Sequence, residues 1–458
     1  MISTMICQLA LWLTLFSWTI SGDAGVGAVL EARAPPPLPS ADDFYKVPDN
    51  LDSYAPGAII RHRPPPNPIA VAGLIHSQNQ YPVHLDASYQ LLYRTTDSLN
   101  NATATVLTVL VPRNANFNKV LSYQAVDDAS NINCAPSYAF QLDSGPSVAQ
   151  GEVLLVEAAL EQGWVVIVPD YLGPKGAFLA NVLAGQAVLD GIRAARNSGA
   201  ITGIGENPTV TLWGYSGGSL ATLFAAELQP SYAPEVAIAG AAAGGAVPNI
   251  TTVLGKVDGT GAAGLIPAGI LGLAHQYPEV DALIQKHVLP QHKDEFYKAD
   301  KMCLLGNINE FSGKNLSQFV DDPSLLYANP TVVRIAGEND LGQHAPKAPL
   351  LVYKATKDEV SPVAETDALV DWYCKQGTAV QYLRDESTNH ESLAVTGAPK
   401  ALAWLRGRMN GEDRQTACET KTVYSVLLDF GALAILPKVL LDAFLDVIGK
   451  RVGPFIKW

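Results

Sequence analysis

The chain has few charged residues and no excess of basic ones. Asp, Glu, Lys and Arg make up 16% of its 458 residues, against about 25% in typical globular domains. The net charge is −13, and binding to phosphates requires clustered Lys and Arg, so we expect no nucleic-acid partner. Because 48% of the residues are hydrophobic, the composition excludes disorder over most of the chain.

Motifs for metals and cofactors are also missing. The sequence contains no CxxC pair, no HExxH motif, no calcium-binding loop and no phosphate-binding loop. No GxGxxG motif stands in the strand–turn–helix context that dinucleotide binding requires. We therefore expect neither a cofactor nor a metal.

Cysteine is scarce, and its distribution indicates export. The five cysteines are Cys7, Cys134, Cys303, Cys374 and Cys418. Cys7 lies in an uncharged apolar run followed by small residues, a pattern that predicts a signal peptide over residues 1–24. A membrane anchor is the alternative, for which the run is short. We therefore expect a secreted protein, in which the other four cysteines form two disulfides with three possible pairings.

Three N-glycosylation sequons accompany this export pattern. They begin at Asn101, Asn249 and Asn315. Such sequons also arise by chance, but in an exported chain they predict glycans on exposed loops.

Short apolar runs rich in β-branched residues alternate with helical stretches. The runs predicted as strands are residues 104–111, 119–126, 164–168, 209–213, 348–355 and 379–383. The predicted helices are residues 178–197, 219–228, 363–375 and 393–409. Apolar strands separated by helices predict a mostly parallel sheet covered on both faces, which is an α/β architecture.

Interruptions of this alternation divide the chain. Proline-rich runs make residues 25–70 loop-like, and the pattern becomes irregular after Ala246 before it resumes near residue 348. We assign residues 25–60 to an N-terminal extension, 61–246 and 341–420 to the core, 247–340 to an insertion, and 421–458 to a C-terminal tail.

The tail contains an apolar helical stretch, residues 439–448, on which Asp442 and Asp446 form a narrow polar stripe. One interpretation is an interfacial flap at a lipid-facing site. The other is a C-terminal helix docked on the core.

The pentapeptide Gly214-Tyr215-Ser216-Gly217-Gly218 is the most informative motif. It follows a predicted strand and precedes a predicted helix. GxSxG in this context is typical of a nucleophile elbow, in which small residues allow a turn tight enough to expose the serine. A glycine-rich turn that only packs a helix on a strand is the alternative. We predict that Ser216 is a nucleophile.

A serine nucleophile requires a histidine base, which a carboxylate orients. In α/β-hydrolases these residues follow in the order Ser, acid, His. The histidines that precede Ser216 or a suitable acid loop are His62, His76, His84, His275, His287, His292 and His344. His390 remains, in a loop after a late strand, and we predict that it is the base.

The predicted acid is Asp358, just after the strand at residues 348–355. Glu359 is adjacent and is expected to point away. Asp340 precedes that strand, so it should lie at the wrong end of the sheet.

An oxyanion requires two preorganised donors. One should be the backbone N–H of Gly217, after the nucleophile. The other should come from the loop at residues 126–130, where composition alone leaves the donor open and Asp127 and Asp128 could equally form a solvated turn.

Taken together, these residues resemble the fungal secretory lipases, the α/β-hydrolase family typified by Candida antarctica lipase A. The resemblance covers about residues 60–420. It rests on the GYSGG pentapeptide and on four further strings, which are SYQ at 122–124 leading to Asp128, NCAPSY at 133–138, VPDYLGP at 168–174, and AVLD with IRA at 187–194.

The resemblance implies a carboxylic ester hydrolase with an inserted helical cap and a C-terminal flap. By motif, Ser216, Asp358 and His390 correspond to the triad, and Asp128 corresponds to an oxyanion-hole aspartate that pairs with Gly217. Such an aspartate must be protonated to donate. The family's disulfides correspond to Cys134–Cys303 and Cys374–Cys418. Gln186 departs from the pattern, because many members have His there, and this leaves the substrate specificity open.

Two active-enzyme hypotheses follow. The first is a secreted triacylglycerol lipase, expected to be a monomer that contacts lipid interfaces transiently. The second is an esterase or deacetylase for a soluble small molecule, such as an acetylated trichothecene-type metabolite. A catalytically inactive binding protein is disfavoured by the intact Ser–Asp–His set.

Overall fold

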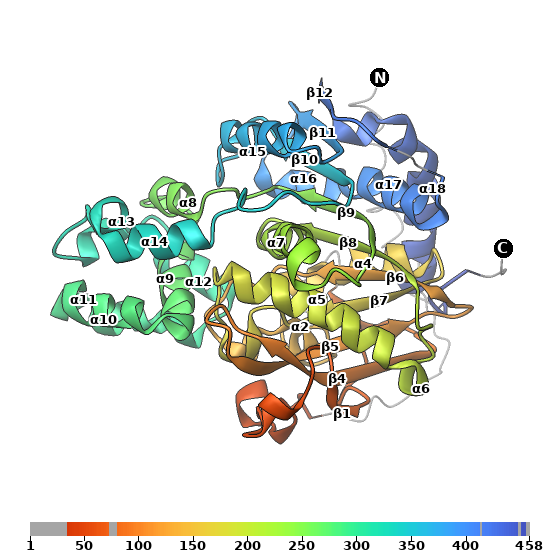
Figure 1. Ribbon diagram of the computed structural model, residues 1–458, viewed down its shortest axis with the longest axis horizontal. Coiled ribbons are helices and arrows are strands. Elements are labelled where there is room, and N and C mark those ends of the chain that lie inside the picture. Colours follow the sequence, from red (N-terminus) through yellow and green to blue (C-terminus); the bar gives the residue numbers. More distant parts are fainter. Residues whose placement is uncertain (1–33, 73–79, 413–414, 448–449, 455–458) are drawn as a thin grey trace, which may run out of the picture. The chain divides into compact units, whose positions relative to one another are not determined.

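A ten-stranded sheet forms the centre of the computed structural model (Figure 1). The structure describes residues 34–72, 80–412, 415–447 and 450–454, so the predicted signal peptide lies outside the described residues. In spatial order, the strands are β1 (Ile59–Arg63), β4 (Ala87–Thr96), β5 (Ala102–Val111), β7 (Trp164–Pro169), β6 (Asn116–Gln124), β8 (Thr209–Tyr215), β9 (Ile238–Gly244), β10 (Leu350–Ala355), β11 (Val380–Asp385) and β12 (Glu419–Val423).

The sheet is antiparallel from β1 to β7 and parallel from β7 to β12. Every residue of β7 and β10 is buried, as expected for strands with helices on both faces. The predicted α/β architecture with a mostly parallel sheet is therefore confirmed. A small hairpin, β2 (Ala70–Ala72) and β3 (Gln80–Pro82), lies outside the sheet.

Two hydrophobic cores cover the two faces. One lies under α5 (Asn181–Asn197), α7 (Gly217–Tyr232) and α15 (Val363–Lys375). The other lies under the second group of helices, which comprises α4 (Val153–Leu160), α16 (His390–Thr396), α17 (Ala398–Asn410) and α18 (Phe430–Val447). The sheet thus holds its strand ends rigidly between two layers of helices.

Between β9 and β10 the chain forms a separate group of helices, at the left in Figure 1. Its ends meet at a neck, where the N–H of Leu341 donates to the carbonyl of Pro248 at 3.0 Å. We call this group the cap. Its helices are α8 (Ile250–Val257), α9 (Leu265–Gln276), α10 (Pro278–His287), α11 (Pro290–Phe296), α12 (Leu304–Phe311), α13 (Leu325–Ala328) and α14 (Pro330–Glu338).

The structure differs from the sequence prediction in a helix, in a region predicted as loop and in the tail. The single helix predicted at residues 393–409 is two helices that break at Gly397, where a Cβ would lie 2.6 Å from the ring of Tyr353. Pro399 lies in the first turn of α17, where the N–H that a proline lacks would have no partner within the helix. Residues predicted as loop contain the edge strand β1 and the short strand β2. The terminal helix begins at Phe430, nine residues before the predicted start at 439.

Helix α18 packs against α17 and α4. Ala432 and Ile435 on its inner face are buried, and Asp442 pairs with Lys438 and Lys450. The inner face therefore has the docked arrangement that was one of the two interpretations.

Two disulfides are present. Cys134 pairs with Cys303, which links the segment after β6 to the start of α12 in the cap. Cys374 pairs with Cys418, which links the end of α15 to the segment before β12. These are the pairs that the family resemblance implies.

Candidate active site

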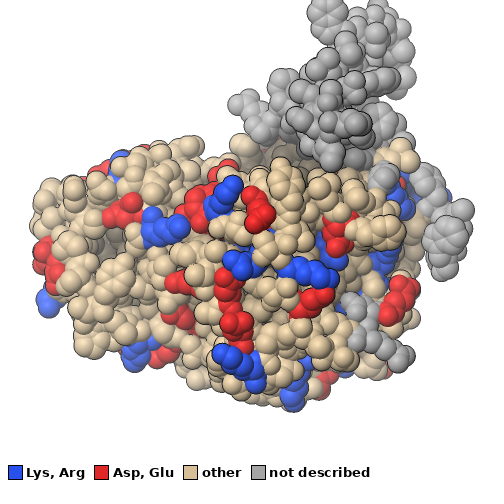
Figure 2. Space-filling view, turned by 90° about the horizontal axis from the view of Figure 1, so that it is seen from above, with Lys and Arg blue, Asp and Glu red and all other residues tan. Residues whose placement is uncertain are grey.

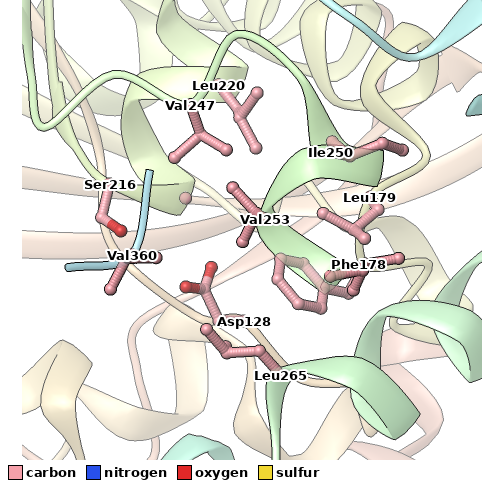
Figure 3. A pocket seen from close by; sticks show the side chains of 12 residues that line it. Asp128, Phe178, Leu179, Ser216, Leu220, Val247, Ile250, Val253, Leu265 and Val360 are labelled. Atoms are coloured by element: carbon pink, nitrogen blue, oxygen red, sulfur yellow. The ribbon is translucent and has the colours of Figure 1, made fainter. Parts of the chain in front are cut away.

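Ser216 lies in a strained turn between β8 and α7. Its φ is +50°, a backbone conformation that costs energy for a residue with a side chain. A Cβ on Gly214 would lie 2.3 Å from the carbonyl oxygen of Gly218, and one on Gly218 would lie 2.0 Å from that of Gln124. Glycine is therefore required at both positions, and the turn points the Ser216 side chain into a pocket (Figure 3).

His390 lies against this serine. Its Nε2 is 2.7 Å from the Ser216 Oγ, and its Nδ1 is 2.7 Å from Asp358 Oδ2. His390 is the first residue of α16, whose preceding turn is closed by a capping box between Asn389 and Ser392. The structure therefore brings together the serine, the histidine and the aspartate that the sequence analysis selected.

The backbone of His390 is also held from both sides. Its N–H donates to Glu359 Oε2 at 2.9 Å, and its carbonyl accepts from the Tyr215 hydroxyl at 2.5 Å. Glu359 was expected to point away, yet it supports the histidine loop. Asp340, the other rival acid, instead accepts the backbone N–H of Ile250 at the start of α8.

The Asp358 carboxylate has a donor at every lone-pair position. Oδ1 accepts the N–H groups of Val360 and Ser361 at 2.9 and 2.7 Å. Oδ2 faces both His390 and the ammonium group of Lys354, the latter at 2.8 Å. Burial alone would raise the pKa of Asp358, but His390 and Lys354 outweigh it and hold that pKa well below its usual range.

Asp128 lies beside the serine in a very different environment. A Cβ on Gly217 would lie 1.8 Å from Asp128 Oδ1, so the carboxyl group lies directly against the start of α7. Oδ1 has no hydrogen-bond partner, and the backbone has a positive φ of 44°. Burial raises the pKa of Asp128 to about 7. Figure 3 shows its carboxyl group and the Ser216 hydroxyl directed into one pocket.

Buried polar groups hold the loop that carries Asp128. Glu152 accepts the N–H of Val126 at 2.9 Å, and the Tyr171 hydroxyl donates to the carbonyl of Ala125 at 2.8 Å. Asp127 is buried rather than part of a solvated turn, and burial near Asp170 raises its pKa well above the usual range. The loop is therefore fixed from the core side.

The pocket at Ser216 is small and apolar. Its free volume is about 30 Å³, enough for about two water molecules. Ile250 and Leu254 of α8 also line a second cavity of about 370 Å³, which lies among the cap helices and is mostly apolar.

The other predicted positions are less informative. Asn101 and Asn315 are exposed, and Asn249 is partly buried and caps α8 with its side chain. Gln186 is buried in α5, and its Oε1 has no partner. Glycosylation remains a prediction at all three asparagines.

The described residues contain neither a metal-binding cluster nor a membrane-spanning helix. No group of three or more His, Cys, Asp or Glu side chains there could hold a metal ion. Within those same ranges, no helix combines the length and hydrophobicity needed to span a membrane. On the face in Figure 2, acidic and basic side chains are interspersed among uncharged ones.

Comparison with known proteins decides the family. The sequence profile described as "Secretory lipase" matches residues 139–417. The chain belongs to the secretory lipase family. It is 44% identical over 434 residues to "Lipase A" of Arthroderma benhamiae, covering 93% of this chain and 91% of the relative. It is 37% identical to "Lipase 4" of Candida albicans, covering 84% of each.

A solved structure agrees with this membership. Candida antarctica lipase A has a TM-score of 0.76 at 28% identity, and the match covers 93% of this chain and all of that one. A rice cell wall degrading esterase from Xanthomonas oryzae, at 16% identity and a TM-score of 0.62, shares the fold. The predicted family and the α/β-hydrolase fold are confirmed, and the protein is a carboxylic ester hydrolase of the lipase type.

Proposed function

We propose that the protein is a secreted triacylglycerol lipase that works through an acyl-enzyme on Ser216. The observation that carries this proposal is the continuous contact from Ser216 through His390 to Asp358. His390 takes the Ser216 proton as Oγ attacks the ester carbonyl, and Asp358 holds the imidazole and stabilises its positive charge. His390 then gives the proton to the leaving alcohol, and water releases the acid by the same steps.

The oxyanion is bound at the pocket wall. The N–H of Gly217 is one donor, and the neutral carboxyl group of Asp128 is the other. The raised pKa of Asp128 and its unpaired Oδ1 support this role, because burial of a carboxyl group with few donors favours its protonated form.

The cavities favour long acyl groups. Ile250 and Leu254 line both the pocket at Ser216 and the cap cavity, and the cap cavity offers far more room than an acetyl group needs. Because the pocket at Ser216 holds only about 30 Å³, cap side chains must move for substrate to enter. The comparisons also do not favour the soluble-metabolite esterase.

Secretion and architecture complete the proposal. The family is described as secretory, and the disulfides suit an oxidising compartment. The signal peptide at 1–24, the extension at 25–60, the core at 61–246 and 341–420, the cap at 247–340 and the tail at 421–458 are the proposed divisions.

An ester series from acetyl to long acyl groups tests this function. We expect the rate to rise with chain length and to increase further above the substrate's solubility limit, because longer chains bury more apolar surface. Ser216→Ala should abolish hydrolysis without unfolding. The matched control, Ser231→Ala, removes an exposed serine near the end of α7, the helix that follows Ser216, and should leave the rate unchanged. A maximum at acetyl with no interfacial increase would contradict the lipase assignment.

The role of Asp128 predicts a loss of activity at alkaline pH. Its carboxyl group is protonated below a pKa of about 7 and loses its proton above it, so kcat/KM should fall as the pH rises through this range. Asp128→Asn donates at every pH and should lack this alkaline fall. Asp128→Ala should lower kcat by about a hundred-fold to a thousand-fold. An alkaline limb that persists unchanged in Asp128→Asn would assign the fall to another group.

The outer face of α18 is proposed to contact the lipid surface. Phe430, Leu433 and Leu441 are exposed there, and Phe430 has 87% of its surface accessible. Replacing Phe430 and Leu433 by Gln should weaken binding to emulsions about tenfold or more, because each side chain contributes about 1.5–3 kcal/mol when it is buried. Hydrolysis of a dissolved short-chain ester should not change. Leu99→Gln, at an exposed turn far from α18 in sequence, is the control. Equal emulsion binding by all variants would exclude this face.

A further inference from the structure

Lys354 is a fully buried cation next to the proposed triad. It lies in β10, and its side chain is completely inaccessible to solvent. Its Nζ donates to the carbonyl of Ala246 at 2.8 Å and lies 2.8 Å from Asp358 Oδ2. An ammonium group in such a place is costly unless it is paired. Burial lowers the pKa of Lys354, and the charge of Asp358 opposes that effect.

Lys354 contacts both the proposed catalytic acid and the start of the cap. It shares Asp358 Oδ2 with His390, so it fixes the oxygen that orients the imidazole. Through Ala246 it also holds the residue where the chain leaves β9 for the neck of the cap. It therefore joins the acid to the base of the cap.

Other charged groups lie near Lys354 and Asp358 but act on different residues. Glu359 holds the backbone N–H of His390, and the ring of Tyr215 lies 5.5 Å from the imidazole. Glu365 and Lys256 act on Lys354 through longer-range charge interactions, and Asp385 acts on Tyr215. Lys354 is the cation in direct contact with Asp358.

We propose that Lys354 is a positioning residue for ester hydrolysis, and that its charge keeps the enzyme active at lower pH than Asp358 and His390 alone would allow. The inference rests on the proposed function. An isolated carboxylate favours a positively charged imidazole, which cannot act as a base. The ammonium group of Lys354 offsets part of the charge of that carboxylate, and so weakens the attraction between the carboxylate and a proton on the imidazole.

The test compares Lys354→Met, which has no donor, with Lys354→Gln, which donates without charge. The readout is the pH profile of kcat/KM on a dissolved short-chain ester. Active sites are counted by titration with a serine-reactive phosphonate, so unfolded protein does not affect the rate. In both variants the acidic limb should move to higher pH by about one unit or more. We expect kcat to fall while KM changes little.

Lys357→Gln is the matched control, because it removes an exposed lysine from the loop after β10 and should leave the profile unchanged. A profile and a kcat per titrated site equal to the wild-type values in Lys354→Gln would show that Lys354 is only structural. In that case Ser216→Ala would still be inactive, so failure of this inference is distinct from failure of the proposed function.

A double variant keeps the test open if the single variants do not fold. Lys354→Met with Asp358→Asn removes both buried charges, and so avoids leaving either one unpaired. Because Lys354 acts through Asp358, turnover of the double variant should equal that of Asp358→Asn within about twofold. A further loss of about tenfold or more would contradict the proposal.

Discussion

The tight turn at Ser216 is the constraint on which the rest of the site depends. The left-handed backbone of the serine and the lack of space for a side chain at Gly214 and Gly218 place the hydroxyl at the carboxyl edge of the parallel strands. The strands β10 and β11 run parallel to their neighbours, so the loops that follow them begin at that same edge. Asp358 and His390 can therefore meet the serine although 142 and 174 residues separate them from it in the chain.

Two aspartates near Ser216 have opposite pKa shifts because their surroundings differ. Asp358 is surrounded by four donors, which favour its charged form. Asp128, whose carboxyl group lies against Gly217, has an oxygen without a donor, and burial raises its pKa to about 7. These two environments suit the proposed roles, in which an anion orients the base and a neutral acid donates to the oxyanion.

Much of this arrangement could be predicted from the sequence, because the motifs are local and the chain order of the triad is constrained. The strand–GYSGG–helix pattern located the turn, and the elimination of earlier histidines left His390. The limits of the cap helices and the break at Gly397 could not be predicted, because they depend on contacts with distant side chains such as Tyr353. Lys354 stands in the apolar run LLVYKA, and its contact with Ala246 could not be predicted because it depends on the pairing of β9 with β10. Glu359 was misplaced for the same reason, since its partner is a backbone group 31 residues away.

Covalent trapping tests the central claim, that His390 activates Ser216, most directly. The intact protein is treated with a long-chain alkyl phosphonate, and the modified peptide is identified by mass spectrometry. The account predicts one phosphonyl group per chain, on Ser216, and labelling at least about a thousand-fold slower when His390 is replaced by Ala. Labelling at another residue, or at the wild-type rate without His390, would contradict it.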